Sequence, residues 1–350
     1  MKLKDLGRRL EGGGKTLLRA SLLKLLPKPR PYTGPADPSK IRRILAVRHD
    51  ARLGNLLLLT PSLKLLKTAF PQARVEVLLS DRYGQALAFN PDVDEILTAK
   101  SLAGLRLRGY DLAVDFSPHH AFSLSSAVWT ALSGATQRVG FDRGEAASFL
   151  NELVPVPERD AHETAHLARL VRHAAPNASL PDDDSLRTRW HFGPGERETG
   201  RATWRSWGID EQSVALFLGA RAEKRLEPAW FLDLGARLVR SGRKVVLTGG
   251  PAERSLMATL TMPSGIFLAP ELPLRAFAAA IANARAVLTA DTGPMHLAVA
   301  LDVPTVQMFG FTEPWRFGYG HLREHAVLHT PGRHPSPEEA FESLTSLLTR

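Results

Sequence analysis

The sequence predicts an α/β fold in two halves, each built on a parallel sheet, and three observations lead to this prediction. From residue 41 onward, short runs of Leu and β-branched residues alternate with segments of helical length, which is typical of βα units. A stretch rich in Pro and Asp at residues 155–190 interrupts the alternation, which then restarts. At 350 residues, the chain is long enough for roughly two domains of about 150 residues each.

The first half is expected to contain five strands with helices between them. Because helices separate the strands, the connections are crossovers and the sheet is parallel. The strands are expected at residues 43–48, 75–79, 94–98, 111–116 and 138–140. The helices are expected at residues 55–69, 82–88, 101–107 and 120–133, with one more at 161–174 inside the interruption.

The second half repeats the pattern. Strands are expected at residues 213–218, 244–248, 285–289 and 304–309, and helices near 228–240, 252–259, 273–283 and 294–301. The simplest architecture is two Rossmann-like domains with a cleft between them, and ligands then bind at the carboxyl ends of the strands. We divide the chain into a basic segment and linker (1–40), an N-terminal domain (41–175), a linker (176–190), a C-terminal domain (191–335) and a C-terminal helix (336–350).

Composition excludes several classes of protein. The chain contains no cysteine, which excludes disulfides, thiolate nucleophiles and every Cys-based metal site and fits a reducing compartment. No stretch reaches the ~18 mostly apolar, uncharged residues that span a bilayer. The first fifteen residues lack the apolar core of a signal peptide. We therefore expect a cytoplasmic protein that does not cross a membrane.

The positive charge is concentrated at the N-terminus. The formal net charge is +9, and residues 1–43 account for all of it with twelve basic and three acidic side chains. This segment has a single aromatic residue, Tyr32, which argues against a nucleic-acid partner. Its leucines, interleaved with Lys and Arg, suit a helix lying on an anionic membrane surface. The alternatives are a solubilising tail or a helix packed on the body of the protein.

Two short motifs are expected to be structural. Gly14-Lys15-Thr16 resembles the end of a phosphate-binding loop, but the glycine required five positions earlier is Arg9. His162-Glu163-Thr164-Ala165-His166 has the HExxH spacing of zinc proteases. The family's third ligand would fall at residue 172, which is an arginine. We therefore expect no metal and no cofactor.

The most informative motif follows the strand that is expected at 285–289. Asp291 and Thr292 supply polar groups at the strand end, Gly293 permits close backbone approach, and His296 lies one turn into the next helix. The amides of a helix N-terminus bind phosphates, and carboxylate or hydroxyl groups bind sugar hydroxyls. Taken alone, such a motif is more often simply a well-capped helix.

Two further strand ends favour the functional interpretation. Gly219-Ala220-Arg221 follows one strand and leads to Lys224 and Arg225, and Gly249-Gly250-Pro251 follows the next and leads to Glu253. Three neighbouring strand ends thus carry cations, carboxylates and a capped helix. This combination predicts a site for a sugar nucleotide, with the diphosphate on Lys224 and the helix N-terminus.

These blocks resemble glycosyltransferase family 9, the bacterial heptosyltransferases of lipopolysaccharide core assembly. The resemblance extends over residues 41–320 and implies a GT-B fold, an inverting mechanism without a metal, and an ADP-linked heptose donor in the C-terminal domain. The matching blocks include Leu53-Gly54-Asn55, Lys224-Arg225, Gly249-Gly250-Pro251 with Glu253, Asp291-Thr292-Gly293-Pro294-Met295-His296, and Thr312-Glu313-Pro314-Trp315-Arg316.

The resemblance also assigns roles to residues. Lys224 would contact the phosphates, aided by Arg225, and Glu253 the adenosine ribose; the loop Asp291–Gly293 and His296 would bind heptose and diphosphate. The N-terminal domain would take a lipid-anchored saccharide acceptor at the inner face of the inner membrane. Arg48, Arg52 and Gly54 would lie on this acceptor side.

One departure from the family concerns the catalytic base. The family has Asp directly after the glycine of the first helix, whereas this chain has Asn55. A carboxamide orients a hydroxyl but does not accept its proton. Asp50 in the preceding loop is the first candidate for a replacement base, and His49 the second. The alternatives are a nucleotide-sugar-binding protein with little or no catalysis and a GT-B-type sugar-nucleotide epimerase. A second, minor departure is Phe311, where the family has Pro.

Overall fold

The computed structural model describes residues 31, 34–35, 37–50, 52–101, 104–156, 161–220 and 222–350. The helix expected on a membrane surface and most of the basic segment lie outside these residues. Within the described part of the chain, no helix is long and apolar enough to cross a membrane.

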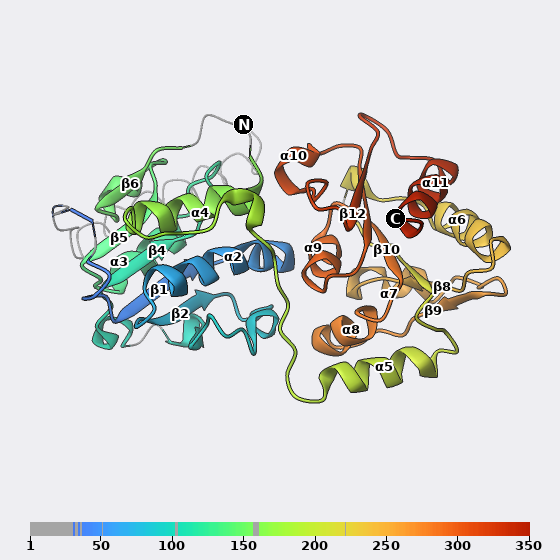
Figure 1. Ribbon diagram of the computed structural model, residues 1–350, viewed down its shortest axis with the longest axis horizontal. Helices are drawn as coiled ribbons and strands as arrows, with labels where there is room; N and C mark the ends of the chain where they lie inside the picture. Colours follow the sequence, from blue (N-terminus) through green and yellow to red (C-terminus); the bar gives the residue numbers. More distant parts are fainter. Residues whose placement is uncertain are drawn as a thin grey trace, which may run out of the picture.

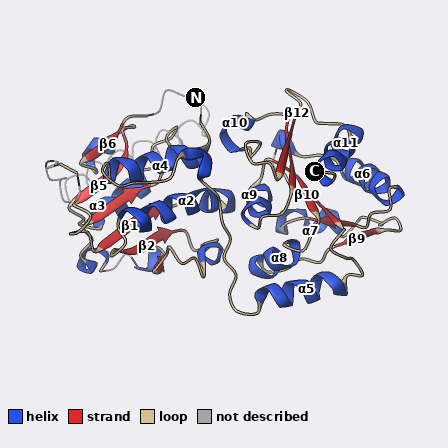
Figure 2. Ribbon diagram, in the orientation of Figure 1, coloured by secondary structure: helices blue, strands red, loops and turns tan. Residues whose placement is uncertain are grey.

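Two six-stranded sheets, each parallel throughout, form the framework (Figures 1 and 2). The strand order is β3-β2-β1-β4-β5-β6 in the first sheet and β12-β11-β10-β7-β8-β9 in the second. The first sheet contains β1 (Arg43–Arg48), β2 (Arg74–Leu79), β3 (Glu95–Leu97), β4 (Leu112–Asp115), β5 (Gln137–Phe141) and β6 (Glu152–Val154). The second contains β7 (Val214–Phe217), β8 (Val245–Thr248), β9 (Ile266–Leu268), β10 (Ala286–Ala290), β11 (Thr305–Phe309) and β12 (His325–His329).

Helices cover both faces of each sheet. In β1, Ile44 and Ala46 belong to one buried cluster, whereas Leu45 and Val47 belong to another on the opposite face, as the two-residue period of a strand requires. The N-terminal lobe comprises the first sheet with α2 (Leu53–Ala69), α3 (Leu124–Leu132) and α4 (Glu163–Ala174). The C-terminal lobe comprises the second sheet with α5 (Glu196–Ser206), α6 (Pro228–Arg240), α7 (Arg254–Met257), α8 (Leu274–Ile281), α9 (Gly293–Ala300), α10 (Pro314–Phe317) and α11 (Pro337–Leu348).

Helix α2 forms the main contact between the lobes. It packs on α4 in its own lobe and on α9 in the other (Figure 1). Leu57 and Leu58 are fully buried in clusters whose other members come mostly from the C-terminal lobe. The chain that crosses between the lobes is tied to both, because Arg189 N donates to Thr60 Oγ1 at 3.0 Å and Trp190 N donates to Ala300 O at 2.9 Å.

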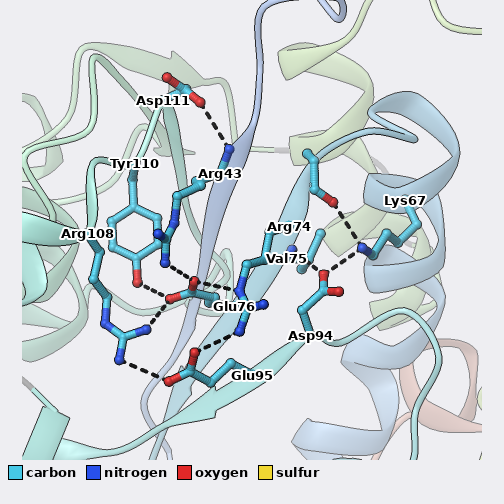
Figure 3. Close-up of polar contacts among 11 residues, drawn as sticks. Arg43, Lys67, Arg74, Val75, Glu76, Asp94, Glu95, Arg108, Tyr110 and Asp111 are labelled. Carbon is cyan, nitrogen blue, oxygen red and sulfur yellow. Dashed lines mark hydrogen bonds and ion pairs between the residues drawn. The ribbon is translucent and has the colours of Figure 1, made fainter.

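An ion network around the carboxylate of Glu76 links β1, β2 and the segment before β4 in the first sheet (Figure 3). The carboxylate of Glu76 in β2 is fully buried and accepts hydrogen bonds from Tyr110 at 2.6 Å and Arg108 at 2.8 Å, and it also pairs with Arg43 and Arg74. Burial alone would raise the pKa of Glu76, but the hydrogen bonds from Tyr110 and the arginines bring it below its ordinary value. Since Arg43 and Arg74 open their strands, this network lies away from the carboxyl ends that hold the candidate site.

The nine strands expected from the sequence are present, but the expectations missed or misassigned several other elements. The edge strands β6 and β9, of three residues each, were missed, and so were β12 and α5. The helices expected at 82–88 and 101–107 are wrong: Gly84–Leu87 and Leu105–Arg108 form 3₁₀ turns. Gly104 and Gly109, which flank the second turn, have left-handed backbones that end any helix there.

Candidate functional site

Three loops with functional side chains meet at one edge of the second sheet. Strands β10, β7 and β8 are neighbours in that order, and the loops that follow them carry Asp291, Lys224 and Glu253. Because the strands are parallel, their carboxyl ends lie at the same edge. The structure therefore brings the three loops together as the sequence predicted, although Arg221 lies outside the described residues.

Lys224 and Asp291 form an ion pair at the centre of this edge. Lys224 Nζ lies 2.5 Å from Asp291 Oδ2, and Thr312 Oγ1 donates to the same oxygen at 2.8 Å. The Asp291 side chain is 8% exposed and that of Lys224 is 23% exposed, so the ammonium is the more accessible partner. Arg225 takes a different direction and donates to the main-chain oxygen of Ala220 at 3.4 Å.

A shallow hollow, open to solvent, lies beside this pair. Lys224 and Thr312 contribute its polar wall, and Phe311 and His334 contact each other at its rim with ring centroids 5.1 Å apart. Its remaining lining is mostly apolar and consists of Leu226, Ala290, Met308, Gly310 and Pro335.

Glu253 is buried between the ends of β7 and β8. Its Oε2 accepts a hydrogen bond from the main-chain amide of Gly250 at 3.0 Å, as in a helix-capping interaction. A Cβ atom on Gly219 would lie 2.7 Å from the same oxygen, so the glycine at the end of β7 makes room for this carboxylate. Sequence reasoning placed Glu253 here but did not foresee that one of its oxygens is already engaged.

Helix α9 presents its N-terminus to the same edge. Thr292 occupies the N-cap position with an extended backbone, and its hydroxyl donates to Ala290 O at 3.2 Å. Within the described chain, no side chain caps the first amides of this helix. Uncapped amides and the helix dipole together attract anions.

His296 lies deeper than the sequence suggested. It is 5% exposed, and its Nδ1 shares a hydrogen bond of 2.8 Å with the hydroxyl of Tyr319. Burial lowers the pKa of His296 to about 4, so the imidazole is neutral at pH 7. We expected this imidazole to face a phosphate; instead its ring lies against the N-terminal lobe, where a Cβ on Gly54 would come within 2.5 Å of Cδ2.

The N-termini of α2 and α9 face each other across the lobes. A Cβ on Gly293 would lie 3.4 Å from Leu53 Cβ and 3.7 Å from Gly54 N. Both helices begin at this point, α2 at Leu53 and α9 at Gly293. Two positive helix ends therefore converge on one place in the interface between the lobes.

Asp50 lies beside the start of α2 with its carboxylate held by its neighbours. Arg48 Nε donates to Oδ2 at 2.9 Å, Asn55 Nδ2 donates to the same oxygen at 2.8 Å, and Arg52 N donates to Oδ1 at 3.1 Å. Arg48 is 1% exposed and also donates to the main-chain oxygen of Phe116. The structure thus brings Arg48, Asp50 and Asn55 together, whereas Arg52 contributes its backbone.

The HExxH segment joins the two lobes. Glu163 is 2% exposed and accepts hydrogen bonds from Arg316 of the C-terminal lobe at 3.0 and 3.1 Å. His166 Nδ1 and His162 Nε2 are buried without a hydrogen-bond partner. The described residues contain no group of His, Asp and Glu side chains arranged to hold a metal ion.

Two lobes, each built on a six-stranded parallel sheet, are the architecture of the GT-B glycosyltransferases. Solved structures agree: a glycosyl transferase family 9 protein from Veillonella parvula superposes with a TM-score of 0.75 at 20% identity, covering 91% of this chain and 99% of that one. ADP-heptose LPS heptosyltransferase II of Escherichia coli superposes with a TM-score of 0.73 at 22% identity, covering 88% of this chain and 98% of that one.

Sequence comparison places the chain within a family. The profile of glycosyltransferase family 9 (heptosyltransferase) matches residues 99–342, and the chain belongs to this family. It is 26% identical over 317 residues to lipopolysaccharide heptosyltransferase 1 of Pseudomonas aeruginosa, covering 81% of this chain and 83% of that protein. It is 24% identical over 310 residues to lipopolysaccharide heptosyltransferase 3 of Escherichia coli, covering 77% of this chain and 87% of that protein. The chain is thus a glycosyltransferase of the heptosyltransferase family.

Proposed function

We propose that this protein transfers a heptose from ADP-heptose to a saccharide of the lipopolysaccharide core or another lipid-linked saccharide. The observation that carries the proposal is the convergence of the N-termini of α2 and α9, which brings a diphosphate-binding end and the Asp50 carboxylate to one interface. Related structures support the choice of donor, since Escherichia coli heptosyltransferase WaaC has been solved with ADP and with ADP-2-deoxy-2-fluoro heptose.

The donor binds at the strand ends of the C-terminal lobe. Its diphosphate accepts hydrogen bonds from the amides of Thr292 and Gly293 and pairs with Lys224, which partly exchanges Asp291 for the phosphate. Asp291 then accepts hydrogen bonds from hydroxyls of the sugar, and the second carboxylate oxygen of Glu253 accepts hydrogen bonds from hydroxyls of the ribose. His296 supports this site from beneath as a neutral imidazole.

Transfer is a single displacement at the anomeric carbon. An acceptor hydroxyl oxygen forms the new bond to this carbon, the bond to the diphosphate oxygen breaks with its electron pair, and Asp50 accepts the hydroxyl proton. ADP leaves with one additional negative charge, which Lys224 and the N-terminus of α9 stabilise. Contact between the lobes brings the two substrates into line.

The acceptor side lies in the N-terminal lobe, near Arg48, Arg52 and Gly54. A lipid-linked acceptor is presented at a membrane, and the basic residues of segment 1–43 supply attraction to an anionic surface of about 1 kcal/mol per Lys or Arg. We therefore propose that the protein acts as a peripheral enzyme on the inner face of the inner membrane.

A second candidate function rests on Asn55. If neither Asp50 nor His49 acts as the base, the chain binds a nucleotide sugar without turning it over. Release of ADP from ADP-heptose, measured with and without an acceptor saccharide, separates the two functions. We expect release that depends on the acceptor and falls at least about 100-fold in Asp50→Asn. Binding of ADP-heptose without acceptor-dependent release would support the binding protein instead.

A further inference from the structure

We infer that Asn55 is the positioning residue for Asp50, and that the two side chains act as one unit. The inference rests on the proposed function, because it assigns Asp50 the proton of the acceptor hydroxyl.

The hydrogen bonds around Asp50 leave a defined position for a substrate. A carboxylate accepts about four hydrogen bonds, two at each oxygen. Oδ2 accepts two, from Arg48 Nε and Asn55 Nδ2, and Oδ1 accepts one, from Arg52 N. The remaining acceptor position lies on Oδ1, where a substrate hydroxyl can donate its proton.

The backbone of the same loop is also fixed. Ser80 Oγ donates to the main-chain oxygen of Asp50 at 3.0 Å, and Asp50 N donates to Arg48 O at 3.0 Å. Asp50 is 27% exposed at its side chain whereas Arg48 is 2% exposed, so the buried guanidinium supports a carboxylate that solvent reaches. This arrangement orients an accessible acceptor group on a rigid support.

An amide suits position 55 because the side chain there lies within hydrogen-bond distance of the Asp50 carboxylate. Two carboxylates in hydrogen-bond contact do not both ionise near neutral pH, since each disfavours the charge of the other. Asn55 instead donates an N–H to Asp50 and adds no charge. Asn55 is also the third residue of α2, whose first turn contains no acidic residue, so Asp50 supplies the negative charge that the helix N-terminus attracts.

Exchange of the two side chains tests whether they act as a unit. The variants are Asp50→Asn, Asn55→Asp and the double exchange, and kcat and kcat/KM for acceptor-dependent ADP release are measured from pH 5 to 9. Asp50→Asn is expected to lose at least about 100-fold in kcat. The double exchange is expected to recover at least about tenfold of that loss, because it restores one carboxylate and one amide donor in contact.

Asn55→Asp alone is expected to add an ionisation between pH 5 and 8 to the kcat/KM profile, since two carboxylates then share one site. Asn177→Asp adds the same charge at an exposed residue and should leave the profile unchanged. An exchange variant no better than Asp50→Asn, together with an unaltered profile for Asn55→Asp, would overturn the inference.

Binding of ADP, measured by calorimetry on each variant, separates this inference from the proposed function. If the wild-type protein binds no ADP and releases none from ADP-heptose, the proposed function fails. If the wild type is active and every variant binds ADP as the wild type does, the kinetic results bear on the Asp50–Asn55 pair alone. Thermal unfolding of each variant identifies a loss that comes from misfolding.

Discussion

Gly54 at the start of α2 lies directly against the imidazole of His296 in α9, at a distance that leaves no room for a side chain. A Cβ at residue 54 would lie 2.5 Å from Cδ2 and 3.2 Å from Nε2 of that ring. His296 has little freedom to move away because its Nδ1 is hydrogen-bonded to the buried Tyr319. The glycine therefore sets how closely the two lobes approach.

Replacement of Gly54 by Ala tests this contact. The added methyl group forces the lobes apart or displaces His296, and overpacking of this kind costs about 1–3 kcal/mol. We expect kcat/KM for the donor to fall more than tenfold and the free energy of unfolding to decrease. Gly84→Ala is the matched control, because its Cβ would meet the flexible end of Leu79 at 3.3 Å and Ile96 Cγ2 at an ordinary contact distance of 3.6 Å; equal effects of the two substitutions would refute this account of Gly54.

Lys224 provides a second test through its pairing with Asp291. Lys224→Ala removes the cation for the diphosphate and leaves the nearly buried Asp291 carboxylate without its ammonium partner. We expect kcat/KM for the donor to fall about 100-fold, since charge-stabilising groups of this kind contribute about 3 kcal/mol. Lys244→Ala breaks an exposed pair with Asp210 and should change kcat/KM less than twofold. Full activity in Lys224→Ala would exclude its role at the phosphates.

The ion pair between Arg316 and Glu163 is expected to stabilise the contact between the lobes. Arg316→Ala leaves the buried Glu163 carboxylate without its guanidinium, a loss of about 1–3 kcal/mol in the free energy of unfolding. Arg205→Ala, which breaks an exposed pair with Glu211, should cost less than about 0.5 kcal/mol. Urea unfolding measures both, and similar values for the two variants would contradict a joining role for Arg316.

Stability should also depend on pH through His296. Its pKa is about 4 in the folded protein and 6.5 in an unfolded chain. Between these values the unfolded chain binds a proton that the folded protein does not, so stability is full above pH 6.5 and is lost as the pH falls toward 4. His162, whose pKa burial lowers to about 3, acts in the same direction.

Buried carboxyl groups oppose this trend, because burial raises the pKa of Glu152 to about 7 and of Asp115 to about 6. A comparison of His296→Gln with the wild type isolates the imidazole. We expect the variant to lose less stability than the wild type between pH 6.5 and 4.5 in urea unfolding. Parallel curves for the two proteins would show that His296 does not contribute to the acid sensitivity.

Much of the fold, and the grouping of the loops at the candidate site, could be predicted from sequence because local patterns encode them. The nine main strands are short apolar runs bounded by turns, and parallel connections bring the loops after β7, β8 and β10 to one edge. Lys224, Glu253 and Asp291 could therefore be placed together from their positions after strands. The three-residue strands β6 and β9 were missed, and their length alone does not explain this, because β3 is equally short and was predicted.

The side-chain environments depend on contacts that no local pattern specifies. The burial of His296 follows from its contacts with Gly54 and Tyr319. Glu163 pairs with Arg316, which lies 153 positions further along the chain. The hydrogen bond between Asn55 and Asp50 is closer in sequence, but its geometry depends on how the loop turns into α2. Sequence therefore identified the candidate groups, and the structure added which of them are paired.

Calorimetric titration of the wild-type protein and of Lys224→Ala with ADP-heptose tests the central claim most directly. We predict saturable binding by the wild type, weakened at least tenfold in Lys224→Ala, which corresponds to about 1.4 kcal/mol. Equal affinity in the two proteins, or no binding by the wild type at millimolar ADP-heptose, would contradict a diphosphate site at Lys224 and the N-terminus of α9.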